Sequence, residues 1–234
     1  MSEYKEIYTK LAPYELASLY AREAGRAAEI IGFADRFNNL VRMSENNPDN
    51  ERIATTVERL IDGANATFKN YNREIDKKIF KELMMIYYDS VKTDFRPSFF
   101  NLVDSKYRSD INRFSDYVYE KTIFCDKAKY IQFLKSYKAS SVNKIKNDPA
   151  YIISRSIAEI IAEKISFITR ELNSRLSVLN KDYMKAQMEF QDGTLFYPDA
   201  NSTLRVTYGE VKGFKPIDAV YNMCLKSKSL GQNS

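Results

Sequence analysis

Histidine is absent from this 234-residue sequence, and its absence removes several classes of enzyme at once. Without an imidazole there is no Ser-His-Asp triad and no Cys-His pair, because no other side chain supplies a base near neutral pH so readily. The commonest zinc ligand is missing as well. The sequence therefore predicts a chain with no complete catalytic site of its own and no catalytic residue to assign.

Cysteine, glycine and proline are scarce. The two cysteines, Cys125 and Cys224, lie far apart and lack CxxC spacing, so we expect neither a metal site nor a disulfide framework. There are only 7 glycines and 6 prolines. Sandwiches and barrels need many turns, so this scarcity favours long elements with few connections. No dinucleotide, P-loop, HExxH or EF-hand pattern is present, and we expect no cofactor and no metal.

Long hydrophobic runs are also lacking. No apolar stretch approaches the roughly 20 residues of a membrane-spanning helix, so no membrane partner is expected. The N-terminus, MSEYKEIYTK, has no apolar core of the kind that signal peptides carry. If Met1 is the natural start, we expect the chain in the cytoplasm. If the chain is a piece of a longer protein, its own N-terminus says nothing about export.

What the sequence does have is a sizeable apolar fraction, 44%, and a concentrated positive charge. The net charge of +5 arises within residues 104–147, where ten basic side chains face five acidic ones. The basic residues are Lys106, Arg108, Arg113, Lys121, Lys127, Lys129, Lys135, Lys138, Lys144 and Lys146. We interpret them as solvated helix faces, with a nucleic-acid patch as the alternative.

Aromatic side chains are interleaved with these charges. They are Tyr107, Tyr117, Tyr119, Phe124 and Tyr130. Such rings can stack nucleic-acid bases, but at this spacing we expect them in the core. Nucleic acid is therefore not an expected partner.

Apolar residues at three- and four-residue steps predict helices over most of the chain. We expect a long helix over 14–42, a second from Asn47-Pro48 to Phe68, and a third over Arg73–Val91. Gly25, Ala27 and Ala28 are small enough to let another helix approach the first one closely. The third should have one apolar side formed by Ile75, Ile79, Leu83, Ile86 and Tyr87. Shorter helices should occupy the basic stretch, at about 108–122, 126–138 and 140–146.

Asp148-Pro149 is the clearest helix start, a capping acid followed by proline. The helix beyond it should reach Phe190, with four-residue ion pairs Arg155–Glu159 and Glu171–Arg175 on its wet side. Its apolar stripe is Ile157, Ile161, Ile165, Ile168, Leu172, Leu179 and Tyr183. A helix this long must lie against others. The expected fold is all-α: a multi-helix bundle with long antiparallel helices and a short β or irregular C-terminal segment.

The character of the sequence changes at Gln191. Asp192-Gly193 and Pro198-Asp199 are turn dipeptides, and near-alternation predicts a strand over 203–212. A strand needs a partner for its backbone, and no second strand is evident. This suggests that the chain stops where another domain begins. In the isolated chain we expect the segment to lie on the helices as an irregular arm, or to pair with a second copy in a homodimer. We divide the chain into a helical domain 1–190, a segment with turns and a predicted strand at 191–220, and a tail at 221–234.

A distinctive block of residues spans Phe196–Gly209. Its residues include Tyr197, Pro198, Asp199, Ala200, Asn201, Thr203, Leu204, Arg205, Thr207, Tyr208 and Gly209. This block resembles one in the bacterial serine dipeptidyl-peptidases of the dipeptidyl-peptidase 7 and 11 type. The likeness continues over Val211–Val220, and a weaker echo lies in Tyr71–Phe80, Tyr87 and Pro97-Ser98.

The resemblance implies a fold and a role. Members of that family are exported enzymes, periplasmic or on the cell surface, that remove dipeptides from peptide N-termini. A double β-barrel carries their Ser-His-Asp triad, and an inserted helical domain covers the cleft. The family's catalytic His and Asp precede the helical domain, and its serine follows the matching block, so none falls in this chain. The resemblance implies a non-catalytic helical cap domain that helps gate peptide substrates, and it makes residues 191–220 the start of a truncated β-barrel segment. Its partner would be the β-barrel domain, and it would meet a peptide substrate only there.

One alternative stays open from the residues themselves. An independent helical module could bind protein or nucleic acid through the basic 104–147 region.

Overall fold

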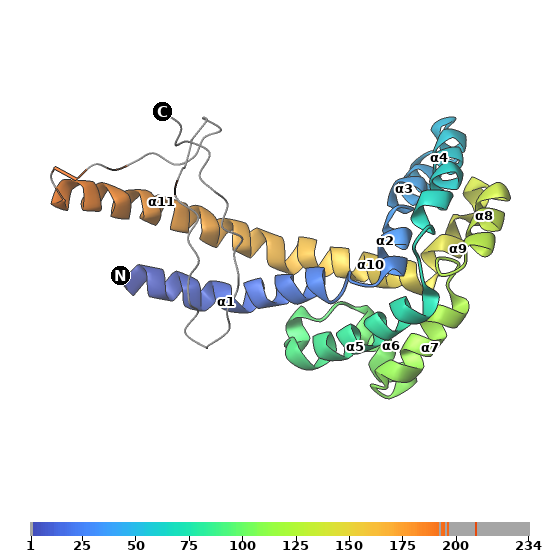
Figure 1. Ribbon diagram of the computed structural model, residues 1–234, viewed down its shortest axis with the longest axis horizontal. Coiled ribbons are helices and arrows are strands. Elements are labelled where there is room, and N and C mark those ends of the chain that lie inside the picture. The colour runs from blue at the N-terminus through green and yellow to red at the C-terminus, as the bar shows by residue number, and fades with distance from the viewer. Residues whose placement is uncertain (1, 192, 195, 197–208, 210–234) are drawn as a thin grey trace, which may run out of the picture. The chain divides into compact units, whose positions relative to one another are not determined.

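The computed structural model describes residues 2–191 together with 193, 194, 196 and 209, and these residues form an all-α structure (Figure 1). The chain divides into two compact units, Met1–Lys185 and Ala186–Ser234. Helices dominate and no strand occurs within the described ranges, which confirms the expected fold class. The predicted strand at 203–212 lies outside the described residues except for Gly209, as does the predicted tail at 221–234.

Short connections join the helices in chain order. The α-helices are α1 (Ser2–Glu23), α2 (Glu29–Asp35), α3 (Asn38–Asn46), α4 (Arg52–Thr67), α5 (Arg73–Ser90), α6 (Phe99–Tyr107), α7 (Ile111–Lys121), α8 (Lys127–Lys135), α9 (Val142–Lys146), α10 (Pro149–Ile160) and α11 (Ser166–Phe190). Two 3₁₀ turns, η1 (Thr93–Phe95) and η2 (Ala139–Ser141), and a π-helical turn, η3 (Ile161–Ile165), complete the order.

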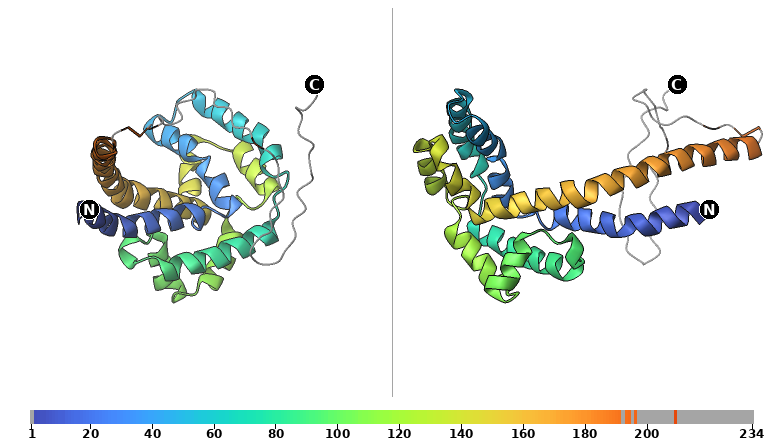
Figure 2. Two further views of the ribbon diagram at one scale, coloured as in Figure 1. Left: turned by 60° about the vertical axis from the view of Figure 1, so that its left-hand side comes forward. Right: turned by 180° about the vertical axis from the view of Figure 1, so that it is seen from behind.

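Helix α1 and the part of α11 up to Lys185 lie side by side and antiparallel, as Figures 1 and 2 show. Ile7, Leu11 and Leu176 form a small buried cluster between them. Near the start of α1, the Glu3 carboxylate accepts from Arg175 Nε at 2.6 Å. The predicted long antiparallel helices are therefore present. The predicted ion pair of Arg175 with Glu171 is wrong, because the guanidinium reaches across to Glu3.

The long helix predicted from Asp148-Pro149 to Phe190 is confirmed, with one π turn at η3 between α10 and α11. The Asp148 side chain accepts from the N–H of Ala150 at 2.9 Å and caps the helix. Its apolar stripe is buried at Ile157 and Ile165 but thins along α11, where Leu176 is the single buried residue. The predicted Arg155–Glu159 pair is present at 3.3 Å.

The single helix predicted over 14–42 is wrong. Helix α1 already starts at Ser2 and ends at Glu23, and α2 and α3 follow as separate helices. Gly25 lies at the break, where a Cβ atom would be 3.0 Å from Ile157 Cδ1 and 3.1 Å from Tyr87 Cε1. The close approach expected at this glycine is confirmed. The apolar spacing runs on across the break because all three segments face one core.

The second helix begins later than Asn47-Pro48 predicts. Pro48 is exposed in a turn that the N–H of Asn50 closes by donating to the Asn47 carbonyl at 3.1 Å. Helix α4 starts at Arg52, whose N–H donates to Asn50 Oδ1 at 2.9 Å. Proline therefore shapes the turn before the helix and does not sit in its first turn.

Helix α5 has nearly the predicted bounds, but of the predicted apolar side Tyr87 alone is fully buried. Asp76, Phe80, Met84 and Tyr87 point inward. Three residues of the predicted apolar side are exposed, namely Ile75 at 58%, Ile79 at 40% and Ile86 at 48%. Two adjacent apolar stripes run along this helix, and periodicity does not decide which one packs.

The basic stretch contains α7, α8 and α9, slightly shorter than predicted, and α6 precedes them unpredicted. Aromatic rings join these helices to the rest of the core. Phe37 meets Phe124 and Tyr130 edge to face, with ring centroids 5.0 and 5.3 Å apart. Phe80 meets Tyr119 in the same way at 5.7 Å. Such contacts add to the gain from burial of the rings.

Candidate functional site

The basic stretch is a solvated surface. All ten Lys and Arg side chains of residues 104–147 are exposed, as predicted. Of the interleaved aromatic residues, Tyr119, Phe124 and Tyr130 are buried, and Tyr107 and Tyr117 are half-buried. Rings committed to the core do not offer a stacking platform for bases. The interpretation of these aromatics as core is confirmed.

A buried carboxylate joins α2, α5 and α7. Asp76, 2% exposed, accepts from the backbone N–H groups of Glu29 at 2.6 Å and Ile30 at 3.3 Å, and from the Tyr119 hydroxyl at 2.7 Å. Burial, followed by the charge of Asp76, raises the pKa of Tyr119 well above its ordinary range. Arg73 adds a bond from Nη2 to the Tyr119 carbonyl at 3.1 Å. The weaker block of the resemblance, Tyr71–Phe80, therefore builds a structural joint.

Asp148 forms a second joint. Besides capping α10, its carboxylate accepts from Thr122 Oγ1 at 2.8 Å and from the N–H of Ile123 at 2.9 Å. Burial raises the pKa of the Asp148 carboxyl, and these hydrogen bonds act in the opposite direction. The end of α7 is thus fixed to the start of α10.

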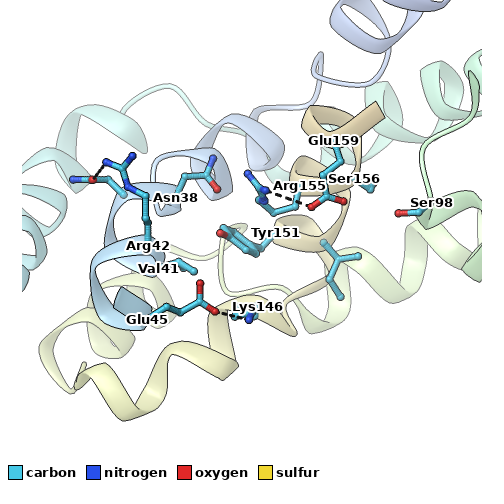
Figure 3. Close-up of a pocket in the computed structure, with 12 residues that line it drawn as sticks. Asn38, Val41, Arg42, Glu45, Ser98, Lys146, Tyr151, Arg155, Ser156 and Glu159 are labelled. Atoms are coloured by element: carbon cyan, nitrogen blue, oxygen red, sulfur yellow. Dashed lines mark hydrogen bonds and ion pairs between the residues drawn. The ribbon is translucent and has the colours of Figure 1, made fainter. Parts of the chain in front are cut away.

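A cleft of about 770 Å³ lies between α3 and α10 (Figure 3). Helix α3 contributes Asn38, Arg42 and Glu45 at four- and three-residue spacing. Helix α10 contributes Tyr151, Arg155 and Glu159 at four-residue spacing. The remaining lining residues are Asn39, Val41, Ser98, Lys146, Ile152 and Ser156.

Charges of both signs line the cleft, and the two carboxylates are both paired. Glu45 pairs with Lys146 at 2.5 Å, and Glu159 pairs with Arg155 at 3.3 Å. Arg42 donates from Nη2 to the neutral Asn39 Oδ1 at 3.1 Å and has no carboxylate within 4.0 Å in the described part of the chain. One guanidinium charge at the cleft is thus left without a counter-charge.

Tyr151 is part of the cleft wall. The residue is 5% exposed, and its ring points toward α3 in Figure 3. Burial raises its pKa, Arg155 lowers it, and Glu45, Asp35 and Glu159 raise it, so three carboxylates lie within electrostatic range of the hydroxyl. The hydroxyl makes no hydrogen bond within the described residues and is not among their fully enclosed polar atoms. It is therefore open to a ligand.

The residues predicted to form the family block lie almost wholly outside the described structure. Residues 197–208 are not described, and Gly209 is exposed with open space around its Cα. The turn predicted at Gly193 is present, with φ at 84° and Thr194 donating to the Gln191 carbonyl at 3.1 Å. Cys125 is a buried free thiol.

The described residues contain no cluster of three or more acidic, cysteine or histidine residues placed to hold a metal. No helix among them has the length and apolar character to cross a membrane.

Comparison with known proteins gives the family. The family model described as Peptidase S46 matches residues 1–225. The chain belongs to the peptidase S46 family. The expected family is thereby confirmed, and the role of the individual residues in Phe196–Gly209 stays a prediction. The match extends five residues past Val220, where the likeness in the sequence ends.

Relatives of this S46 chain are bacterial dipeptidyl-peptidases. An Asp/Glu-specific dipeptidyl-peptidase of Flavobacterium psychrophilum is 29% identical over 222 residues, 94% of this chain and 30% of the relative. A dipeptidyl-peptidase 7 of Phocaeicola vulgatus is 27% identical over 187 residues, 80% of this chain and 25% of the relative. An Asp/Glu-specific dipeptidyl-peptidase of Capnocytophaga gingivalis is 26% identical over 222 residues, which are 94% of this chain and 30% of the relative.

The chain spans less than a third of the length of these relatives, and so matches one part of larger proteins. The sequence predicts the Arg155–Glu159 pair but does not single out the other residues of the cleft. The available signal was polar residues at helical spacing on α3 and α10. That signal becomes a site only when the two helices are known to face each other.

Proposed function

We propose that this chain is the non-catalytic helical domain of a longer, exported, dipeptidyl-peptidase-like S46 protein, where it covers the active-site cleft of a β-barrel domain and helps gate peptides. One observation carries the proposal: the S46 match covers a chain whose described part is helical and which spans less than a third of the length of relatives named as dipeptidyl-peptidases. Histidine is absent from the sequence. A triad would have to come from parts of the parent beyond this chain.

The packing supports a rigid cap. A domain that gates peptides by size must hold its shape as the substrate enters. The Asp76 and Asp148 joints tie together helices that are distant in sequence through buried, charge-assisted hydrogen bonds. A polar cleft between α3 and α10 gives the same body a surface on which a peptide can rest.

The test is a chimera. In the Flavobacterium psychrophilum relative, the 222 matched residues are replaced by the corresponding part of this chain, and release of a chromophore from Asp- and Glu-containing dipeptidyl reporters is measured. We expect hydrolysis to persist in the chimera and to be absent from the isolated chain. A control relative with a short flexible linker in place of the segment should lose its restriction to dipeptide removal.

Two outcomes contradict the proposal. Hydrolysis of reporters by the isolated chain at the level of an ordinary peptidase would show a catalytic site within it. A linker control that keeps both its rate and its restriction to dipeptides would show that the helical domain gates nothing.

The nucleic-acid alternative has one observation in its favour, the exposure of all ten cations of residues 104–147. The burial of the interleaved aromatics opposes it. We expect weak, non-specific binding that moderate salt removes, because phosphate contacts by surface cations release counterions. Tight binding of a defined oligonucleotide at physiological salt would place this alternative first.

A further inference from the structure

The cleft between α3 and α10 has an unbalanced charge. Each carboxylate that lines it already has a cation, Lys146 for Glu45 and Arg155 for Glu159. Arg42 is the third cation of the lining, and among the described residues its side chain hydrogen-bonds to the neutral amide of Asn39. A ligand amine would have to displace an existing ion pair, whereas a ligand anion would meet a charge without a partner. The carboxylate of Asp35, which accepts from Asn38 and Ser154, acts on Tyr151 but is not part of the lining. Among the lining residues themselves, the excess of one cation favours a negatively charged ligand.

We propose that this cleft binds the carboxylate of a peptide, with Arg42 and Arg155 as its cationic ligands and the Tyr151 hydroxyl as a further donor. The choice of a peptide, as opposed to another carboxylate, rests on the proposed function. Guanidinium groups suit carboxylates because their planar N–H groups match both oxygens. Figure 3 shows Arg155 and Tyr151 projecting from α10 into the space that faces α3.

The cost of opening the site is small. Arg42 exchanges one hydrogen bond to a neutral amide for a charge-assisted one, and its side chain is exposed and free to turn. Arg155 holds Glu159 by one bond of 3.3 Å, so most of its N–H groups remain available to a second carboxylate. The Tyr151 hydroxyl has no bond within the described chain to give up.

The shape of the cleft suits a short peptide. Its volume of about 770 Å³ falls within the range of small-molecule sites, roughly 300–1,000 Å³. Val41 and Ile152 add apolar surface to the lining, against which small side chains can pack. Ser98 provides a hydroxyl from the segment before α6.

The experiment uses the full chain and two peptide probes that differ only in the C-terminal group that the cleft is proposed to bind. N-acetyl-trialanine has a free carboxylate, and its C-terminal amide does not. Amide resonances are followed in two-dimensional NMR spectra at low salt. We expect the carboxylate probe to bind with a Kd of about 1 mM or tighter, and the amide at least about tenfold more weakly. Raising sodium chloride to about 0.5 M should weaken the carboxylate probe strongly.

Matched variants locate the site. Arg42→Gln and Arg155→Gln should each raise the Kd of the carboxylate probe about tenfold, and Tyr151→Phe by a few-fold. The control is Arg59→Gln, an exposed cation of α4 outside the cleft, which should leave the Kd unchanged. Shifted resonances should concentrate in α3 and in residues 146–159.

Several results would overturn the proposal. These are equal binding of the two probes, no binding of either, an unchanged Kd in Arg42→Gln, or shifts confined to other helices. Tighter binding of a cationic probe, alanine amide, would reverse the assigned charge preference. The chimera test reads hydrolysis and this test reads binding to the isolated chain, so either can fail while the other succeeds.

Discussion

The carboxylate of Asp76 accepts a hydrogen bond from the backbone N–H of Glu29 at 2.6 Å, across 47 residues of sequence. The residue at the N-cap of α2 is Ala28, whose side chain cannot accept a hydrogen bond. Asp76 therefore caps α2 from a different helix, and a negative charge at that end is favoured by the helix dipole. One side chain sets the relative positions of α2 and α5.

Asp76→Asn should therefore destabilise the fold. The amide keeps one acceptor but brings an N–H₂ group against the donors of Glu29, Ile30 and Tyr119. We expect a loss of about 2–4 kcal/mol in the free energy of unfolding, measured by urea denaturation followed by circular dichroism. Asp89→Asn, exposed on the same helix, should change it by less than about 0.5 kcal/mol. Equal effects of the two variants would refute the cap.

Gly25 and Gly32 make a matched pair for thermal unfolding. An alanine Cβ at position 25 would lie 2.7 Å from the Ala21 carbonyl oxygen and 3.0 Å from Ile157 Cδ1, so Gly25→Ala should lower the Tm by several degrees. Position 32, exposed within α2, has no atom within 4 Å of such a Cβ. Gly32→Ala should raise stability by about 0.5–1 kcal/mol through helix propensity. The prediction fails if both variants shift the Tm in the same direction.

Tyr87 and Tyr119 are both fully buried but differ in their hydroxyl groups. The Tyr87 hydroxyl has no hydrogen-bond partner in the described structure, and burial raises its pKa. Tyr87→Phe should leave stability unchanged or raise it by up to about 1 kcal/mol, because a polar group without a partner is removed. Tyr119→Phe deletes the bond to Asp76 and should cost about 1–2 kcal/mol. A urea midpoint at or above that of the wild type for Tyr87→Phe, and below it for Tyr119→Phe, would support this prediction. A clear loss of stability in Tyr87→Phe would contradict it.

Asp148 should give the fold a measurable pH dependence. Burial raises the pKa of its carboxyl in the folded state, so between the ordinary value of about 3.9 and the raised value the folded chain binds more protons than the unfolded one. The contribution of Asp148 to stability must therefore fall as the pH rises through that window. Asn at this position does not titrate and still caps.

The corresponding measurement is the difference in unfolding free energy between the wild type and Asp148→Asn, taken from about pH 4 upward. We expect the free energy of unfolding of the wild type to fall relative to that of the variant as the pH increases. A difference that moves the other way would mean that the hydrogen bonds from Thr122, Ile123 and Ala150 outweigh burial.

Local capping explains which helix starts the sequence predicts well. Asn72, Asp126 and Asp148 each accept from N–H groups two or three residues ahead, at the starts of α5, α8 and α10. These interactions act within one turn and can be recognised in the sequence. Pro48 gives the wrong helix start because proline also suits a turn before a helix. Here the hydrogen bonds of Asn50 close such a turn, and the helix begins only after it.

The side of a helix that packs is harder to predict. On α5, Ile79 and Phe80 are neighbours in sequence, and only the tertiary structure shows that Ile79 is 40% exposed and Phe80 fully buried. The cleft has the same origin, since Arg42 and Tyr151 are 109 positions apart and line one surface only because α3 and α10 face each other.

The sequence by itself determined the all-α class, the long helix from Pro149, the solvated basic stretch and the absence of histidine chemistry, because each depends on composition or on contacts within a few residues. The tertiary structure decided where the first helix breaks, which face of α5 is buried, and that Arg175 pairs with Glu3. Those outcomes depend on steric exclusion and hydrogen bonds between segments far apart in the chain. No local preference encodes them, since both partners must first be brought together.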